Sequence, residues 1–95
     1  MKKIALGLCA GRHEIPVENY IFSEIPTERI FDFAWQEGMA RSILVDKEVD
    51  ELVLYVTGLT VASFSVMNVC KELGVKLTLM HYNRDSGEYV SQAIK

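Results

Sequence analysis

Three apolar runs divide this sequence, at residues 3–10, 52–56 and 75–82. Each run is short and is bounded by glycine or polar residues, which is typical of a β-strand. The run 52–56 is uninterrupted, as in a strand covered on both faces, whereas the run 75–82 first alternates apolar and polar side chains, as a strand nearer a sheet edge does. We therefore predict that residues 52–56 form a central strand.

Apolar residues recur at helical spacing between these runs. The first predicted helix follows Thr27, which we expect to be its N-cap, and it ends near residues 44–47. Gly38 interrupts this helix and is expected to mark a close approach to another backbone. The second predicted helix is capped by Thr60, ends at Gly74 and is apolar around nearly its whole circumference.

Prolines and turn residues place the remaining segments. The segment 12–26 contains both prolines and is predicted to be a loop that packs onto the body of the domain. Residues 85–87 read as a turn, so residues 88–92 fold back as the second arm of a hairpin. The order β-α-β-α-β-β predicts an α/β fold, a small Rossmann-like domain of two or three layers that spans residues 1–95, with a mostly parallel sheet and a C-terminal hairpin.

This strand order leaves one face of the sheet without a helix. With the strands in sequential order, both helices lie on one face, and the other face needs cover from the loop between Pro16 and Pro26 or from a second subunit. A chain of 95 residues buries apolar surface inefficiently, yet 49% of its residues are hydrophobic and its mean hydropathy is +0.13. We therefore expect a homodimer.

The net charge argues against one class of partner. A formal charge of −3 and a pI near 5.3 are unlike a protein that binds long nucleic acids, because such a protein carries a basic stripe. A small bound anion remains compatible with this charge.

The N-terminal residues and the cysteines bear on the compartment. Lys2 and Lys3 precede an apolar stretch of only seven residues, and Leu8 stands before Cys9 where lipoprotein cleavage needs a small residue, so we expect no signal peptide. Cys9 and Cys70 fall in predicted core elements and are expected to be buried, reduced thiols. Since no segment is long enough to span a bilayer, we expect a cytoplasmic protein with no membrane partner.

A polar cluster follows each predicted strand, at residues 11–14, 57–60 and 81–85. Because the carboxyl ends of parallel strands meet at one edge, and open α/β sheets bind ligands there, we expect the clusters to form one site. A helix N-terminus at that edge supplies backbone donors for an anion. The candidate ligand-binding residues are Gly11, Arg12, His13, Thr57, Gly58, Leu59, Thr60 and His81.

The cluster 57–60 has two interpretations. It is either a strand-to-helix turn, in which Gly58 supplies a positive φ and Thr60 the cap, or an anion site built from exposed amides. The spacing matches neither a Walker motif nor Gly-x-Gly-x-x-Gly, so it supports neither ATP hydrolysis nor NAD binding, and we expect no cofactor.

Arg12, His13 and Glu14 place a cation, an imidazole and a carboxylate side by side. Arg12 could hold a phosphate through two hydrogen bonds, His13 is the candidate acid or base, and Glu14 could orient either; the alternative is a solvated loop with a local ion pair. His81 is expected to point inward, continuing the apolar side of its strand, either as a ligand contact or as a hydrogen-bonded structural histidine.

Other chemistries find less support. A metal site of Cys9, His13 and His81 lacks a closely spaced ligand pair, so we expect no metal. No Gly-x-Ser-x-Gly motif indicates a serine hydrolase. The aromatic residues around Trp35 are expected to belong to the core or to a dimer interface rather than to a platform for stacking bases.

The segment from Leu52 to Tyr82 carries a resemblance. An apolar strand ending in Thr57-Gly58-Leu59-Thr60, an apolar helix, and a strand ending in His81-Tyr82 resemble the ligand-binding half of CARF domains, the Rossmann-like sensors of CRISPR systems. The resemblance covers about a third of the chain, and it implies a dimer that binds a cyclic oligoadenylate across its interface. The small size of an isolated core is similar to that of proteins carried by phages and prophages.

Three function classes follow. The first is a dimeric sensor or sponge that binds a nucleotide or another phosphate-bearing molecule without turning it over. The second is a small nuclease or hydrolase, resembling ring nucleases, that uses His13 with Arg12. The third is an interaction protein without enzymatic activity, such as a phage-borne modulator of a host partner. We favour the first, because the sequence lacks a complete catalytic set.

Overall fold

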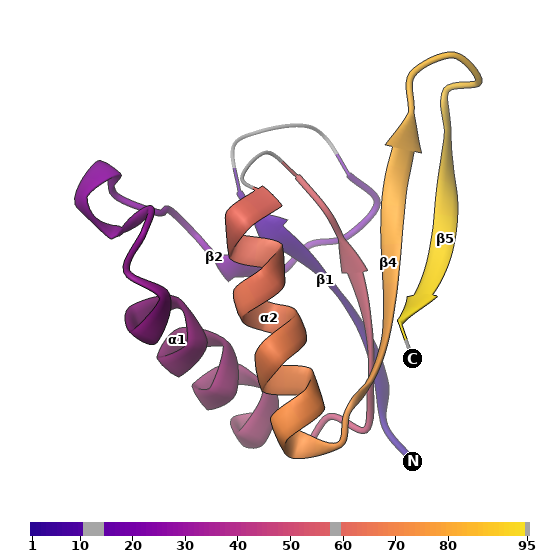
Figure 1. Cartoon of the computed structure of the whole chain (residues 1–95). Helices are drawn as coiled ribbons and strands as arrows, with labels where there is room; N and C mark the ends of the chain where they lie inside the picture. Colours follow the sequence, from indigo (N-terminus) through magenta and orange to yellow (C-terminus); the bar gives the residue numbers. More distant parts are fainter. Residues whose placement is uncertain (11–14, 58–59, 95) are drawn as a thin grey trace.

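The computed structural model describes residues 1–10, 15–57 and 60–94, which form a sheet with its helices packed on one face (Figure 1). The elements, in chain order, are β1 (Lys3–Cys9), β2 (Tyr20–Phe22), the short 3₁₀-helix η1 (Thr27–Arg29), α1 (Phe33–Asp46), β3 (Glu51–Tyr55), α2 (Thr60–Leu73), β4 (Lys76–Asn83) and β5 (Glu88–Ile94).

The strands are ordered β2-β1-β3-β4-β5 across the sheet. The first four of these are parallel and β5 is antiparallel to β4, so the predicted α/β class, mostly parallel sheet and C-terminal hairpin are confirmed. β3 lies between two parallel neighbours, as predicted. The turn at residues 84–87 closes the hairpin with a positive φ of 73° at Gly87.

The core lies between the sheet and the two helices. Leu6, Leu54 and Leu79 stand in register on β1, β3 and β4 and are at most 6% exposed. α2 packs its small and branched residues onto this row, including Ala62 and Val66, which are 1% and 0% exposed. The alternation of the strands therefore gives the helix side its leucines and sends the intervening residues to the opposite face.

That opposite face carries no helix from the described part of the chain (Figure 1). Within one copy of the chain, the strand at residues 52–56 is fully covered on its helix side only, because Val53 and Tyr55 are half-buried on the other face. Part of this face is covered from β2: a Cβ atom at Gly7 would overlap the Tyr20 ring and the Ile15 side chain. Gly7 thus permits Tyr20 to lie over β1.

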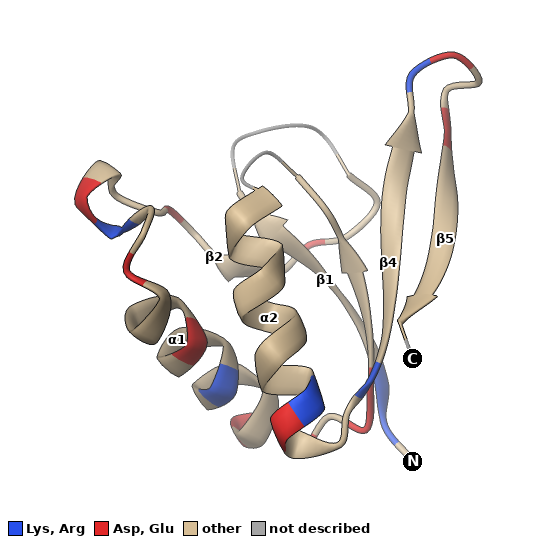
Figure 2. Cartoon of the chain, viewed as in Figure 1, with Lys and Arg blue, Asp and Glu red and all other residues tan. Residues whose placement is uncertain are grey.

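Charged residues stand at the ends of the strands and leave their middle portions neutral (Figure 2). Lys3, Glu51 and Lys76 lie in one row at the amino ends of β1, β3 and β4. The Lys3 ammonium is 3.6 Å from the Glu51 carboxylate. The β4–β5 hairpin carries further charges at its tip, where Arg84 and Asp85 are exposed.

Two local expectations require correction. The segment 12–26 was predicted to be a loop, but Tyr20–Phe22 pairs with β1 as a parallel edge strand, and the N–H of Gly7 donates to the Asn19 carbonyl at 2.9 Å. Three residues are too few for a hydrophobic period to reveal a strand. Gly38 was expected to mark a close backbone contact, yet a Cβ atom there would meet nothing within 4 Å.

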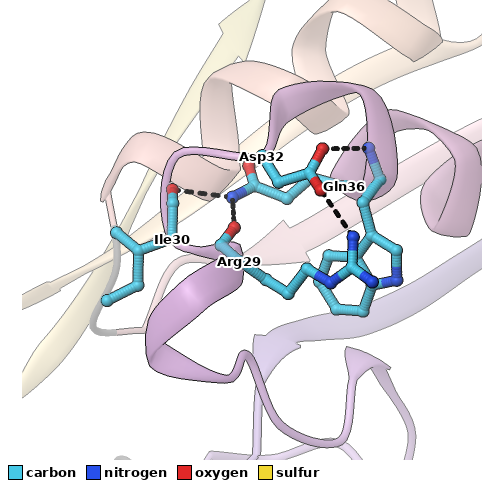
Figure 3. A network of polar contacts seen from close by, with 5 residues as sticks. Arg29, Ile30, Asp32 and Gln36 are labelled. Carbon is cyan, nitrogen blue, oxygen red and sulfur yellow. Dashed lines mark hydrogen bonds and ion pairs between the residues drawn. The ribbon is translucent and has the colours of Figure 1, made fainter.

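The start of α1 also differs from the prediction. Thr27 lies in η1 and does not cap α1; Asp32 is the N-cap, and its Oδ1 accepts a hydrogen bond of 3.1 Å from the N–H of Trp35. Arg29 pairs with the other oxygen of Asp32 at 2.5 Å (Figure 3). A carboxylate accepts a backbone hydrogen bond and also opposes the positive end of the helix, so Asp32 suits this position.

Gln36 joins this capping region to the rest of the helical layer (Figure 3). Its side chain is 1% exposed, and its Nε2 donates to the carbonyls of Arg29 and Ile30, both at 2.9 Å. Its Oε1 accepts from Ser65 Oγ of α2 at 2.7 Å. One buried amide therefore connects η1, α1 and α2.

Candidate functional site

The carboxyl ends of β1 and β3 lie side by side and are joined through Thr57. Thr57 Oγ1 donates to the Cys9 carbonyl at 2.8 Å and accepts from the Cys9 N–H at 3.2 Å. The two chain segments that leave these strands therefore start from one point of the sheet edge, as the sequence predicts. Gly11, Arg12, His13 and Glu14, and likewise Gly58 and Leu59, lie outside the described residues.

The Thr57 hydroxyl is engaged inside the protein. Thr57 is 2% exposed, and its oxygen both donates and accepts in the pairing with Cys9. This side chain therefore holds two strand ends in place, while a direct contact between Thr57 and a ligand stays a prediction.

The N-terminus of α2 begins at the same edge. Thr60 is the first residue of this helix of 14 residues and is exposed, and the first turn contains no acidic residue. Ser63 Oγ donates a hydrogen bond of 2.5 Å to the Thr60 carbonyl, so this bond does not use any backbone N–H group of the first turn. The first N–H groups of a helix have no partner within the helix and carry partial positive charge, and an anion can bind them without a basic side chain.

The N-terminus of α1 is different, because the Asp32 carboxylate already occupies it. The hydrogen bond from the Trp35 N–H, followed by the hydrogen bond from Arg29, lowers the pKa of Asp32 below its usual value. Asp32 is therefore ionised at neutral pH and neutralises this helix end. Neither of the two α-helices that the described residues form has an acid within its first turn, so the difference at α1 comes from the carboxylate of its N-cap, Asp32.

His81 reaches this edge from β4. It lies on the same side of the strand as Leu77 and Leu79, as predicted, and is half-buried. The Val56 N–H donates to the Met80 carbonyl at 3.1 Å, so His81, the next residue of β4, lies beside the carboxyl end of β3. Its Nε2 is 2.9 Å from Gln92 Oε1 of β5, so the imidazole has a structural partner within the hairpin.

Thiols and carboxylates do not assemble into a metal site within the described ranges, where no group of three or more His, Cys, Asp or Glu residues could hold an ion. Cys9 and Cys70 are both free and buried. Burial raises the pKa of the Cys70 thiol from 9.0 to about 11, so this thiol is neutral and unreactive at pH 7.

Two features escaped the sequence reasoning. The buried amide of Gln36 gives no signal in the apolar pattern, because a polar residue within an amphipathic helix is expected to face solvent. The four tyrosines of the chain meet on the helix-free face of the sheet, and strand register could have indicated this: Tyr55 alternates with the buried Leu54, and Tyr82 stands opposite Tyr89.

No protein-family model, curated protein or solved structure matches this chain. Neither helix in the described parts of the chain combines the length and the apolar character needed to cross a membrane.

Proposed function

We propose that this chain is a small nucleotide- or anion-binding domain that acts as a dimeric sensor or sponge. The phosphate group of its ligand would bind at the carboxyl edge of the sheet, against the first turn of α2. The observation that carries the proposal is that this turn contains no acidic residue, although it begins where β1 and β3 end together.

The described groups at this edge favour binding over turnover. Thr60 offers a hydroxyl and a backbone in the first turn of α2, and neither transfers a proton at neutral pH. The His81 imidazole is already paired with Gln92. A nuclease reaction would need His13 as its acid or base, with Arg12 on the phosphate, and this alternative stays a prediction from the sequence.

The ligand class and the compartment are parts of the same proposal. A cyclic oligonucleotide is the ligand that the resemblance to CARF domains implies, and a repeated phosphate suits a site that is duplicated in a dimer. We place the protein in the cytoplasm, since Cys9 and Cys70 are free thiols and such thiols persist where the environment is reducing.

A second candidate function, as an interaction protein, rests on a patch of exposed phenylalanines. Phe31, Phe33 and Phe64 are 75%, 47% and 59% exposed. Phe33 and Phe64 line a groove of about 340 Å³ between α1 and α2, which also contains Glu37 and Asn68. Exposed aromatic side chains of this kind are typical of protein-binding surfaces.

Calorimetric titration of the protein with cyclic oligoadenylates of different ring sizes tests the proposal, and mass spectrometry of the recovered ligand shows whether it was cleaved. An intact bound ligand supports the sensor, and a shortened one supports the nuclease. If no ring binds, and inorganic phosphate does not bind either, the proposal is wrong and the interaction protein is the better reading.

A charge change in the first turn of α2 makes the test specific to this edge. Thr60→Glu places a carboxylate where the ligand phosphate is expected, and it should weaken binding about tenfold or more while the helix keeps its stability. Ser42→Glu is the matched control, because Ser42 is exposed on α1 and undergoes the same change of charge. Wild-type affinity in Thr60→Glu would exclude this helix end as the site.

A further inference from the structure

On the helix-free face of the sheet, charged residues and tyrosines lie in separate rows. The register places four rows across the strands, and the row at the amino ends contains the charged residues Lys3, Glu51 and Lys76. The remaining rows contain tyrosines and small or apolar residues. We call these residues the tyrosine face: Ala5, Gly7, Tyr20, Val53, Tyr55, Thr78, Met80, Tyr82, Tyr89, Ser91 and Ala93.

The tyrosines of this face pack against one another. The rings of Tyr55 and Tyr89 lie edge to face with centroids 4.9 Å apart, and those of Tyr82 and Tyr89 lie 5.4 Å apart. Partial burial first, and then the neighbouring Tyr55, Tyr82 and Tyr20, raise the pKa of the Tyr89 phenol. Rings that already support one another lose little conformational freedom when a partner covers them.

The distribution of charge distinguishes a nucleic acid from a protein as the partner that binds this face. About a quarter of the chain is charged, at 24% of its residues, yet on this side of the sheet the charged residues are confined to the row at the amino ends of the strands, and the rows beyond it contain none. Lys3 and Lys76 flank it only at its amino end, and Lys3 is paired with Glu51. A nucleic acid would find too few cations for its phosphates, whereas a neutral, aromatic surface matches the core of a protein interface.

The dimensions of the face suit a second copy of the chain. With the charged row included, five strands spaced about 4.8 Å apart and seven residues in β1 give a face of about 24 by 20 Å. Two such faces in contact would cover about 1,000 Å² when each is taken as flat, without the added surface of the protruding side chains. This is about the smallest area that a specific interface needs. Sheets commonly pack in this way, about 10 Å apart.

We propose that two copies of this chain associate through their tyrosine faces, sheet against sheet, about a two-fold axis. The central strand β3 would then have the second cover that Val53 and Tyr55 lack in one copy. The charged rows would lie at opposite ends of the interface, where solvent reaches them. This inference rests on the dimer of the proposed function and names the surface that forms it.

Sedimentation velocity over a range of protein concentrations, with one charge placed on each face in turn, tests this proposal. Ala5 is exposed on the tyrosine face, and Ala34 is exposed on α1 in the helical layer. Ala5→Glu would bring two carboxylates into a neutral interface, so the dissociation constant should rise about 30-fold or more, whereas Ala34→Glu should leave it unchanged. Ser91→Lys, also exposed and on the same face, should act like Ala5→Glu, and far-UV circular dichroism shows which variants are folded.

Three outcomes would overturn the proposal. They are a wild-type protein that is monomeric at every concentration, a folded Ala5→Glu or Ser91→Lys that dimerises like wild type, and a dimer that Ala34→Glu disrupts instead. Binding of a single-stranded oligonucleotide that quenches tyrosine emission in the monomer would assign the face to a nucleic acid. A dimer that binds no cyclic oligoadenylate would count against the proposed ligand, and it would leave this interface in place.

Discussion

Ser65 Oγ donates a hydrogen bond of 2.7 Å to Gln36 Oε1, and this bond links the two helices beneath their exposed surfaces. Both side chains are buried, at 2% and 1% exposure. The amide nitrogen of Gln36 has its own partners, the carbonyls of Arg29 and Ile30. The N-terminal half of α1 is therefore fixed relative to α2 by polar contacts from which water is excluded, and such contacts fix geometry because an unpaired group is costly.

We predict that Gln36→Leu lowers the free energy of unfolding by about 3 kcal/mol, because it removes the partner of the Ser65 hydroxyl and of the Ile30 carbonyl and leaves the Arg29 carbonyl with the Asp32 N–H alone. Ser65→Ala removes one of these bonds and should cost about 1 to 2 kcal/mol. Urea unfolding measures both. The structure would be contradicted by a Gln36→Leu protein as stable as wild type.

Thr57→Val should cost about 1 to 3 kcal/mol, because it leaves the N–H and the carbonyl of Cys9 unpaired in a buried place. Thr57→Ser keeps the hydroxyl and should cost less. Chemical denaturation of the two variants measures the difference. If Thr57→Val were as stable as Thr57→Ser, the hydroxyl of Thr57 would contribute nothing to the connection between β1 and β3.

Arg12→Ala should weaken the binding of a cyclic oligoadenylate by about 2 to 3 kcal/mol, because it removes a charged, two-point contact to phosphate. Arg84→Ala removes the same charge from the exposed hairpin tip and serves as the control. His13→Ala should affect any cleavage more than it affects binding, since its predicted additional role is proton transfer. Titration calorimetry measures the affinities; full affinity in a normally folded Arg12→Ala would exclude the predicted contact.

Alkaline pH should destabilise the protein through Cys70. The thiol ionises near pH 9 in the unfolded chain but at about 11 in the folded protein, where burial raises its pKa. The unfolded state therefore releases its proton first, so the free energy of unfolding falls between pH 9 and 11, by roughly 1 to 3 kcal/mol. Comparison with Cys70→Ala isolates this contribution from the other groups that titrate there. An identical pH dependence in both proteins would rule it out.

Two glycine substitutions should act in opposite directions. Gly7→Ala forces the Tyr20 ring and Ile15 to move and should cost about 1 to 3 kcal/mol. Gly38→Ala meets nothing within 4 Å and should stabilise α1 by about 0.5 to 1 kcal/mol. Thermal unfolding compares the two variants. A Gly7→Ala protein more stable than wild type would show that the position of the Tyr20 ring does not require a residue without a Cβ atom at position 7.

The strands β1, β3, β4 and β5 and their order could be predicted because apolar runs and sequential crossovers constrain a parallel sheet strongly, whereas β2, with three residues, was missed. The run 52–56 became the central strand, and the turn at Gly87 closed the expected hairpin. The start of α1 could not be predicted, because Thr27 and Asp32 are both good caps and the choice depends on the partner that Arg29 and Gln36 provide in three dimensions.

The site was predictable only to the level of the sheet edge. The parallel pairing of β1 and β3 brings Cys9 and Thr57 to one edge by topology, and α2 starts there because Thr60 follows three residues later. That the Thr57 hydroxyl pairs with Cys9, and the His81 imidazole with Gln92, depends on register and on side-chain direction, which a sequence pattern does not contain.

The separation of aromatic residues between the two faces has a practical consequence. Trp35, the only tryptophan of the chain, stacks on Phe22 in the helical layer with ring centroids 5.8 Å apart, whereas the four tyrosines gather across the sheet from it. The protein thus carries two intrinsic optical probes. Tryptophan emission reports on events at the helices, tyrosine absorbance and emission report on the opposite surface, and a binding experiment can assign a partner to one side without any added label.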